Sequence, residues 1–162
     1  MGKIKRSILT ALILFTANLC FAKQITVQIV QHDVSADKVM ETSMVVEDEL
    51  LNAFFDNGFI VTNSPAAISV STKEDTALFN SGIGDAYEGY SDYFVQVKLY
   101  FELDESERKN DLKKVDWTLA SAVTGAKIKE STMDKLVYST DSKDLKVLTF
   151  NLVKEIKKAI KA

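Results

Sequence analysis

The chain has 162 residues, with 20 basic and 23 acidic side chains and one histidine, which gives a formal net charge of −3 at pH 7. This length suits one domain built around one hydrophobic core. An acidic chain lacks the basic footprint of nucleic-acid-binding proteins, so no nucleic-acid partner is expected.

The first 22 residues have the layout of a secretory signal peptide. A basic head precedes an apolar run over residues 8–15, and two small residues, Cys20 and Ala22, occupy positions three and one before a cleavage point. We therefore expect cleavage after Ala22 and a mature chain that begins at Lys23. The protein is then periplasmic or secreted.

Two alternatives concern the same segment. In a lipoprotein, Cys20 would become the acylated first residue, but Leu19 stands where a lipoprotein signal carries a small residue. A retained anchor would need about 20 apolar residues to span a bilayer, and the apolar run is shorter. Because Cys20 is the only cysteine, its removal with the signal peptide excludes a disulfide, a thiol nucleophile and a zinc–thiolate site. Removal of the apolar run also leaves no transmembrane segment in the expected mature chain.

The first elements of the mature chain follow from hydrophobic spacing. Residues 24–30 alternate between apolar and polar and predict a half-buried strand. Ser35 can cap a helix over 36–57, where apolar residues recur at helical spacing, and Gly58 supplies its left-handed stop. Residues 59–62 predict a short strand.

A second helix is expected to start at Thr72, within a capping pattern, and to run through Phe79. The pattern does not define the residue at which this helix ends, because three glycines interrupt the segment 82–89. We interpret that segment as a flexible connector. Residues 92–103 give the strongest strand pattern in the chain, with apolar residues at alternate positions.

The last third of the chain predicts a hairpin and a helix. A charged loop over 104–113 leads to a strand over 114–122, the Thr-Gly pair at 124–125 turns the chain, and a further strand covers 127–138. A helix with a leucine and isoleucine stripe is expected over 142–161.

The predicted order is β-α-β-α-β-β-β-α. It corresponds to an α/β sandwich of the α+β class, a mixed sheet of about five strands covered by two to three helices. The chain is expected to divide into a signal peptide, 1–22, and a single α/β domain, 23–162.

Candidate chemistry is sparse, and we expect no enzyme, no cofactor and no metal site. The glycines of 82–89 follow a helix, whereas a dinucleotide-binding fingerprint follows a strand. The acidic residues 47–49 point about 100° apart on a helix and cannot converge on one ion. His32 could form a general base with Asp33, but no serine nearby is marked as a nucleophile, so a surface loop histidine is the preferred interpretation.

Three aromatic residues receive specific predictions. Trp117 lies between apolar neighbours on one face of its strand and should be a core residue. Phe94 and Tyr100 lie on the polar face of the 92–103 strand, where aromatic residues suit a partner-binding surface. The alternative is that the second helix covers this face and makes both residues part of a second core layer.

Two segments resemble a group of small periplasmic α/β domains. "YSDYFVQVKLYFEL" (90–103) resembles the G-A-D-Y strand of that group, with Tyr90 and Ser91 at the glycine and alanine positions, and "VDWTLASAVTGAKIKES" (115–131) is similar to the hairpin that follows it. The group includes the curli secretion lipoprotein, the lipoprotein activators of penicillin-binding proteins and the amino-terminal domain of the Tol-system propeller protein. This chain departs from the group in lacking the lipid-bearing cysteine.

The resemblance implies a non-enzymatic cell-envelope domain that binds other envelope proteins or assembles with itself. Two other functions remain open. One is the binding of a small envelope ligand in a pocket between the sheet and the glycine-rich segment, and the other is a hydrolase without a recognisable motif. An exposed apolar patch would favour the binding of a protein partner, and a pocket with convergent polar groups would favour the binding of a small ligand.

Overall fold

The structure, a computed structural model, describes residues 22–32, 38–104, 109–134 and 142–161. Its elements, in chain order, are β1 (Gln24–His32), α2 (Glu41–Asp56), β2 (Ile60–Asn63), β3 (Ala67–Ser69), α3 (Thr72–Glu88), β4 (Tyr93–Asp104), β5 (Lys109–Ser121), β6 (Lys127–Asp134) and α4 (Ser142–Lys161).

The strands form one mixed sheet in the order β2-β1-β4-β5-β6, and β3 also pairs with β1. β1 is parallel to β2, β3 and β4, whereas β4, β5 and β6 are antiparallel to one another. The predicted mixed sheet is confirmed. The short strand β3 was not predicted, because its three residues carry too little periodicity to be recognised.

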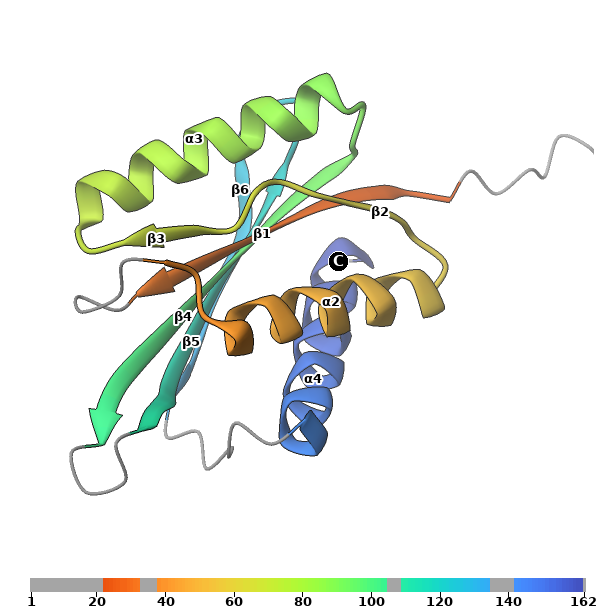
Figure 1. The fold of residues 1–162 in the computed structure, drawn as a ribbon. Coiled ribbons are helices and arrows are strands. Elements are labelled where there is room, and N and C mark those ends of the chain that lie inside the picture. Colours follow the sequence, from red (N-terminus) through yellow and green to blue (C-terminus); the bar gives the residue numbers. More distant parts are fainter. Residues whose placement is uncertain (1–21, 33–37, 105–108, 135–141, 162) are drawn as a thin grey trace, which may run out of the picture.

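Helices cover both faces of the sheet, as Figure 1 shows, with α2 and α4 packed together on one face and α3 on the other. The main core lies between the sheet and the α2–α4 pair. Trp117 is 2 % exposed there, which confirms the prediction that it is a core residue. The described residues contain no helix long and apolar enough to cross a membrane.

The α3 face holds a smaller apolar cluster in which Phe94, Ala86 and Ala122 are buried. The helix continues through Gly82 and Gly84 to Glu88, with Gly89 as its C-cap, so the prediction of a flexible connector is wrong. Gly82 is buried against the ring of Phe94, and a Cβ built there would lie 2.3 Å from Phe94 Cζ. The glycine therefore lets α3 approach the sheet closely and does not interrupt the helix.

Helix α2 begins at Glu41, five residues later than expected, and the predicted cap Ser35 lies outside the described residues. The N-cap is Met40, and no side chain makes a capping hydrogen bond there. The side-chain oxygen of Gln31 in β1 instead holds the start of the helix, because it accepts hydrogen bonds from Met40 N at 2.8 Å and Ser43 Oγ at 2.9 Å. A contact supplied by a strand leaves no local signal in the helix sequence.

Helix α3 begins at Thr72 as predicted, and its N-cap is Ser71, whose hydroxyl accepts a hydrogen bond from Glu74 N. The start of β5 differs from the prediction. β5 begins at Lys109, so part of the predicted loop 104–113 is strand that pairs with β4. β6 is described to Asp134, and the rest of its predicted range lies outside the described residues.

Candidate functional site

A cleft lies between α3 and the part of the sheet formed by β4, β5 and β6. Alternation along β4 directs one set of side chains into the main core and the other set toward α3. The resulting space, here called the α3 cleft, has a volume of about 310 Å³ and is lined by Thr72, Asp75, Thr76, Phe79, Asn80, Gln96, Lys98, Thr118, Gly125, Lys127 and Glu130.

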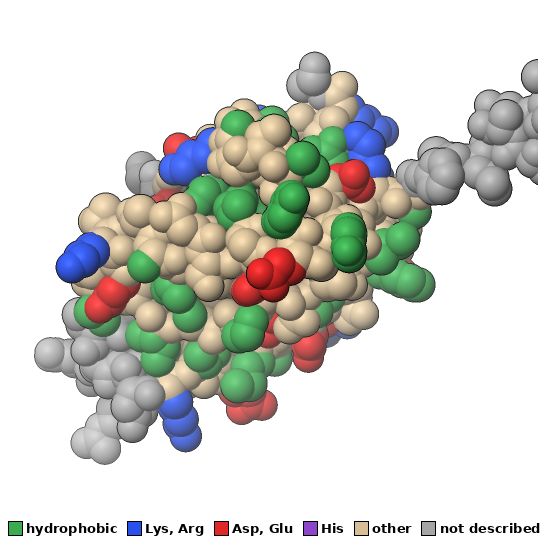
Figure 2. Space-filling view, turned by 90° about the horizontal axis from the view of Figure 1, so that it is seen from above, with side chains coloured by type: hydrophobic (Ala, Val, Ile, Leu, Met, Phe, Trp, Pro, Cys, Tyr) green, Lys and Arg blue, Asp and Glu red, His purple; other side chains and the backbone are tan. Residues whose placement is uncertain are grey.

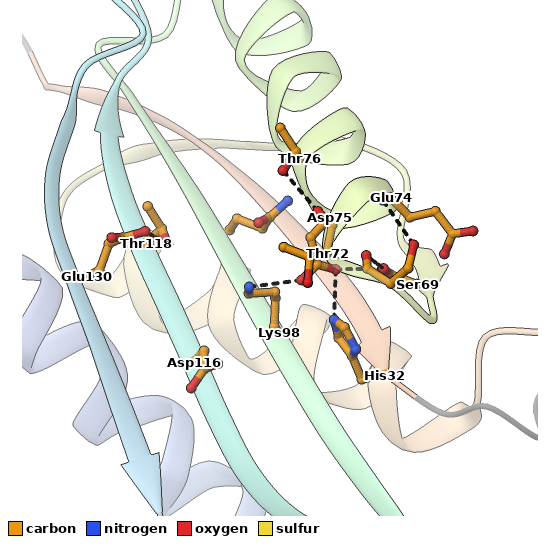
Figure 3. A network of polar contacts seen from close by, with 12 residues as sticks. His32, Ser69, Thr72, Glu74, Asp75, Thr76, Lys98, Asp116, Thr118 and Glu130 are labelled. Atoms are coloured by element: carbon orange, nitrogen blue, oxygen red, sulfur yellow. Dashed lines mark hydrogen bonds and ion pairs between the residues drawn. The ribbon is translucent and has the colours of Figure 1, made fainter.

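Asp75, in the first turn of α3, is the centre of a polar network at one end of the cleft (Figure 3). Its carboxylate accepts hydrogen bonds from Ser69 Oγ at 2.6 Å and His32 Nε2 at 2.8 Å. The other oxygen accepts from Lys98 Nζ at 3.1 Å. The network thus joins the ends of β1 and β3 to β4 through the start of α3.

These contacts set the charge of Asp75. Burial alone would raise the pKa of its carboxyl, but the hydrogen bonds from Ser69 and Lys98, with the field of His32, outweigh burial and hold the pKa below its usual 3.8. The carboxylate is therefore ionised at neutral pH and balances the charge of Lys98.

A second polar group surrounds Tyr100. Its ring stacks on His32 with centroids 4.4 Å apart, and Lys114 Nζ lies 3.8 Å from the ring centroid. Burial, followed by its hydrogen bond to Asp116, raises the pKa of the Tyr100 hydroxyl far above its usual value. Burial works against the ionised Asp116, yet hydrogen bonds from Thr132, Lys114 and Tyr100 hold its pKa low.

A third chain of hydrogen bonds lies beneath α3 and ends at Gln96, which lines the cleft. Ser64 Oγ donates to Asp85, and Gln28 Nε2 donates to Ser64 Oγ at 3.4 Å. Gln96 Nε2 then donates to Gln28 Oε1 at 2.9 Å. Gln28, Ser64 and Gln96 are all buried, so this chain fixes the orientation of both amides beneath α3.

The arrangement does not correspond to a nucleophilic triad. In such a triad a histidine bridges the serine and the carboxylate, whereas here the Asp75 carboxylate lies between Ser69 and His32 and accepts from both. Ser69 therefore donates its hydrogen bond to a carboxylate, and His32, the only histidine of the sequence, does not accept from the serine hydroxyl. Among the described residues, no group of three or more His, Cys, Asp and Glu side chains could hold a metal ion.

The two aromatic residues proposed as partner contacts, Phe94 and Tyr100, lie in different environments. Phe94 is 0 % exposed beneath α3, as the second-layer alternative predicted, and has no surface to offer to a partner. Tyr100 is half-buried within the polar network. His32 is not a loop residue but the last residue of β1, and it pairs with Asp75, while Asp33 lies outside the described residues.

Sequence reasoning missed Asp75, Lys98 and Gln96 as members of one site. The alternation of β4 placed Gln96 and Lys98 on the face opposite the core, which was a usable signal. Asp75 was recognised only as part of a helix start, because its partner His32 is 43 residues away in the chain.

The predicted cleavage-site residues Ala22 and Lys23 are exposed, and Lys23 Nζ donates to the Tyr93 hydroxyl at 2.7 Å.

A second feature lies at the end of α3. Gly89 is the C-cap, Tyr90 N donates to Tyr87 O at 3.1 Å, and Ser91 N donates to Ala86 O at 2.8 Å. This is the Schellman pattern, in which the residue after the cap is left-handed and is usually glycine. Here that residue is Tyr90, with φ of 58° and 90 % of its surface exposed.

Two more exposed apolar residues share this end of the molecule. Tyr87 is 62 % and Val123 67 % exposed, and the hydrogen bond from Ala122 N to Asp92 O joins the β5–β6 turn to the loop after Tyr90. We call these residues, Tyr87, Tyr90 and Val123, the Tyr90 end. Figure 2, which views the molecule from above on the α3 side, shows hydrophobic side chains distributed among polar and charged ones.

Solved structures confirm the resemblance expected from the sequence as a likeness of fold. The PelC dodecamer from Paraburkholderia phytofirmans is 13 % identical, with a TM-score of 0.51, over 82 % of this chain and 86 % of that chain. Lipoprotein GNA1162 from Neisseria meningitidis is 12 % identical, with a TM-score of 0.45, over 84 % and 99 %. The LpoB C-terminal domain from Salmonella enterica is 14 % identical, with a TM-score of 0.42, over 74 % and 87 %.

No curated protein sequence matches the chain. A family model does, and it covers nearly all of the described residues, from the first strand to the end of the last helix. The model has the description "Uncharacterised protein" and matches residues 24–161, so the chain belongs to that family.

Proposed function

We propose that this chain is an exported, non-enzymatic domain of the cell envelope that binds other envelope proteins or assembles with itself. Its first 22 residues are a signal peptide, removed after Ala22 without lipidation, and 23–162 form the single domain. The mature protein is periplasmic or secreted and needs no cofactor.

The position of β1 supports the proposed cleavage site. The strand begins at Gln24, and Gln24 N donates to Asp92 Oδ2 at 2.8 Å, while Lys23 O accepts from Ile60 N at 3.0 Å. Cleavage after Ala22 would keep every one of these contacts. Cleavage a few residues later would remove the start of the strand that pairs with β2 and β4.

The Tyr90 end carries the proposal of partner binding. A non-glycine residue in the left-handed region costs about 1 kcal/mol relative to glycine. Tyr90 has this unfavourable backbone conformation, and its large aromatic ring is exposed to water. Exposed aromatic rings of this kind contribute strongly to protein interfaces. A residue that is both strained and exposed serves a contact outside the domain better than it serves the fold.

Assembly of further copies is the form of binding to test first, because the PelC structure that shares this fold is a dodecamer. Tyr90→Gly removes the ring and relieves the backbone at the same time. We expect the variant to be about 1 kcal/mol more stable in urea unfolding while self-association, or capture of envelope proteins by in-cell crosslinking, falls.

A matched control is Phe55→Ser, which removes another exposed aromatic, 71 % exposed on α2. Light scattering and crosslinking of this variant should remain as in the wild type. Equal loss of assembly in both variants would indicate general surface hydrophobicity. Unchanged assembly in Tyr90→Gly would place the interface elsewhere and contradict the role proposed for the Tyr90 end.

A second function, the binding of a small polar ligand, is favoured by one observation. The α3 cleft brings side chains from α3, β4, β5 and β6 to one space of about 310 Å³. Such a space is at the lower end of the range of ligand pockets.

A further inference from the structure

The charges that line the α3 cleft compensate one another. Lys98 Nζ lies 3.1 Å from Asp75, and Lys127 Nζ lies 2.6 Å from Glu130. Glu130 also accepts from Thr118 Oγ1 at 3.2 Å. A ligand with a net charge would have to break one of these pairs to find a counter-charge, whereas an uncharged ligand leaves both pairs intact.

The floor of the cleft presents a hydrogen-bond acceptor. A carboxylate only accepts, so Asp85 fixes the direction of the chain that runs through Ser64 and Gln28. Gln96 ends this chain by donating its amide nitrogen to Gln28, so its amide oxygen is left to accept. Gln96 is 3 % exposed, and among the described residues nothing donates to that oxygen.

The α3 wall of the cleft offers hydrogen-bonding groups of both kinds. The Asn80 amide and the Thr72 hydroxyl are exposed and line the cleft, and neither has a partner among the described side chains and backbone groups. An amide supplies two donors and an acceptor, and a hydroxyl supplies one donor and two acceptor positions. A matching ligand must therefore both donate and accept at several neighbouring atoms.

One aromatic ring completes the lining. Phe79 meets Phe94 at a steep angle, with centroids 5.5 Å apart, and Lys127 Nζ lies 5.3 Å from the Phe79 centroid. The ring is therefore held in place from beneath by the sheet. An aromatic ring is a suitable surface for the C–H groups on one side of a sugar ring.

We infer that the α3 cleft binds an uncharged, hydroxyl-rich ligand, a sugar of one or two rings. Its hydroxyl groups donate to the Gln96 oxygen and exchange hydrogen bonds with Asn80 and Thr72, while its C–H face packs near Phe79. This site is separate from the Tyr90 end, so it holds whether or not that end binds a partner.

The test is an NMR titration of the ¹⁵N-labelled full chain, in which three pyranose sugars of similar size compare the effect of charge. Glucose is neutral, glucosamine is cationic and glucuronate is anionic. We expect glucose, N-acetylglucosamine or cellobiose to shift the backbone and side-chain signals of the lining residues with a Kd of about 1 mM or tighter. The two charged probes should bind more weakly than glucose.

A pair of matched variants assigns the binding to the cleft. Asn80→Ala should weaken sugar binding about fivefold by removing a neutral hydrogen-bond group. Asn52→Ala, the same change at an exposed position of α2, should leave the Kd unchanged. Cellopentaose, as a longer probe, distinguishes the source: a tighter Kd than that of cellobiose indicates a polysaccharide, and an equal Kd indicates a free sugar.

Three results would overturn the inference. One is the absence of shifts at the cleft with every neutral sugar. Another is stronger binding of glucosamine or glucuronate than of glucose, which would show that the ion pairs open for a charged ligand. The third is an unchanged Kd in Asn80→Ala, which would place the sugar elsewhere.

Discussion

Gly82 lies directly against the ring of Phe94, so close that a Cβ on the glycine would be 2.3 Å from Cζ and 2.6 Å from Cε2 of that ring. The contact joins the middle of α3 to the first residues of β4. It explains why a helix that covers the sheet contains a glycine where the sequence alone indicates an interruption.

Two neighbouring glycines give a matched test of this packing. Gly82→Ala should destabilise the fold by about 1–3 kcal/mol, because the added methyl group has no space beside Phe94. Gly84→Ala should stabilise it by up to about 1 kcal/mol, because Gly84 is exposed with nothing within 4 Å and alanine is the better helix former. Urea unfolding measures both, and equal stabilisation in the two variants would show that α3 does not lie on Phe94.

Phe94 and Tyr100, the two aromatic residues of β4 proposed as partner contacts, should differ in their effect on stability. Phe94→Ala should cost about 3–5 kcal/mol, because the ring is 0 % exposed and its loss leaves a cavity beneath α3. Tyr100→Phe keeps the ring on His32 and removes only the hydroxyl that bonds to Asp116, so it should cost about 1 kcal/mol. Denaturant melts of the single variants check this, and a mild effect of Phe94→Ala would restore that residue as a candidate contact.

The Asp75 network should contribute stability that depends on pH. Asp75→Asn should cost about 2 kcal/mol at pH 7, because His32 and Lys98 lose a charged partner. The folded-state pKa of Asp75 is below its usual 3.8, so the wild-type contribution is complete above pH 3.8 and is lost as pH falls through the folded-state value. The difference in unfolding free energy between wild type and variant should therefore narrow in acid.

The control for that measurement is Asp48→Asn, an exposed aspartate on α2, which should change the unfolding free energy by less than about 0.5 kcal/mol. A gap between wild type and Asp75→Asn that stays constant down to the acid limit of folding would mean that the Asp75 carboxylate has no stabilising charge interaction.

The mature amino terminus is open to direct measurement. Intact-mass analysis of the exported protein should give a chain that begins at Lys23 and carries no acyl group, because Ala22 suits the signal peptidase and Leu19 does not suit the lipoprotein signal. A mass that includes Cys20 with fatty acids would place the protein on a membrane.

The sequence by itself determined the elements whose signals are local. The alternation in β1 and β4, the Thr-Gly turn and the stripe of α4 each depend on residues within a few positions of one another, and each element is present as predicted. The faces of β5 were also readable, because Val115, Trp117 and Leu119 alternate with polar neighbours and are buried as expected.

Only the tertiary structure decided the features that join distant parts of the chain. The late start of α2 depends on Gln31 in β1, and the course of α3 through Gly82 depends on Phe94 in β4. The same is true of Asp75, whose pairing with His32 assembles one end of the α3 cleft. A glycine, a glutamine or an aspartate has no periodic signal of its own, and its role is set by the group that packing brings against it.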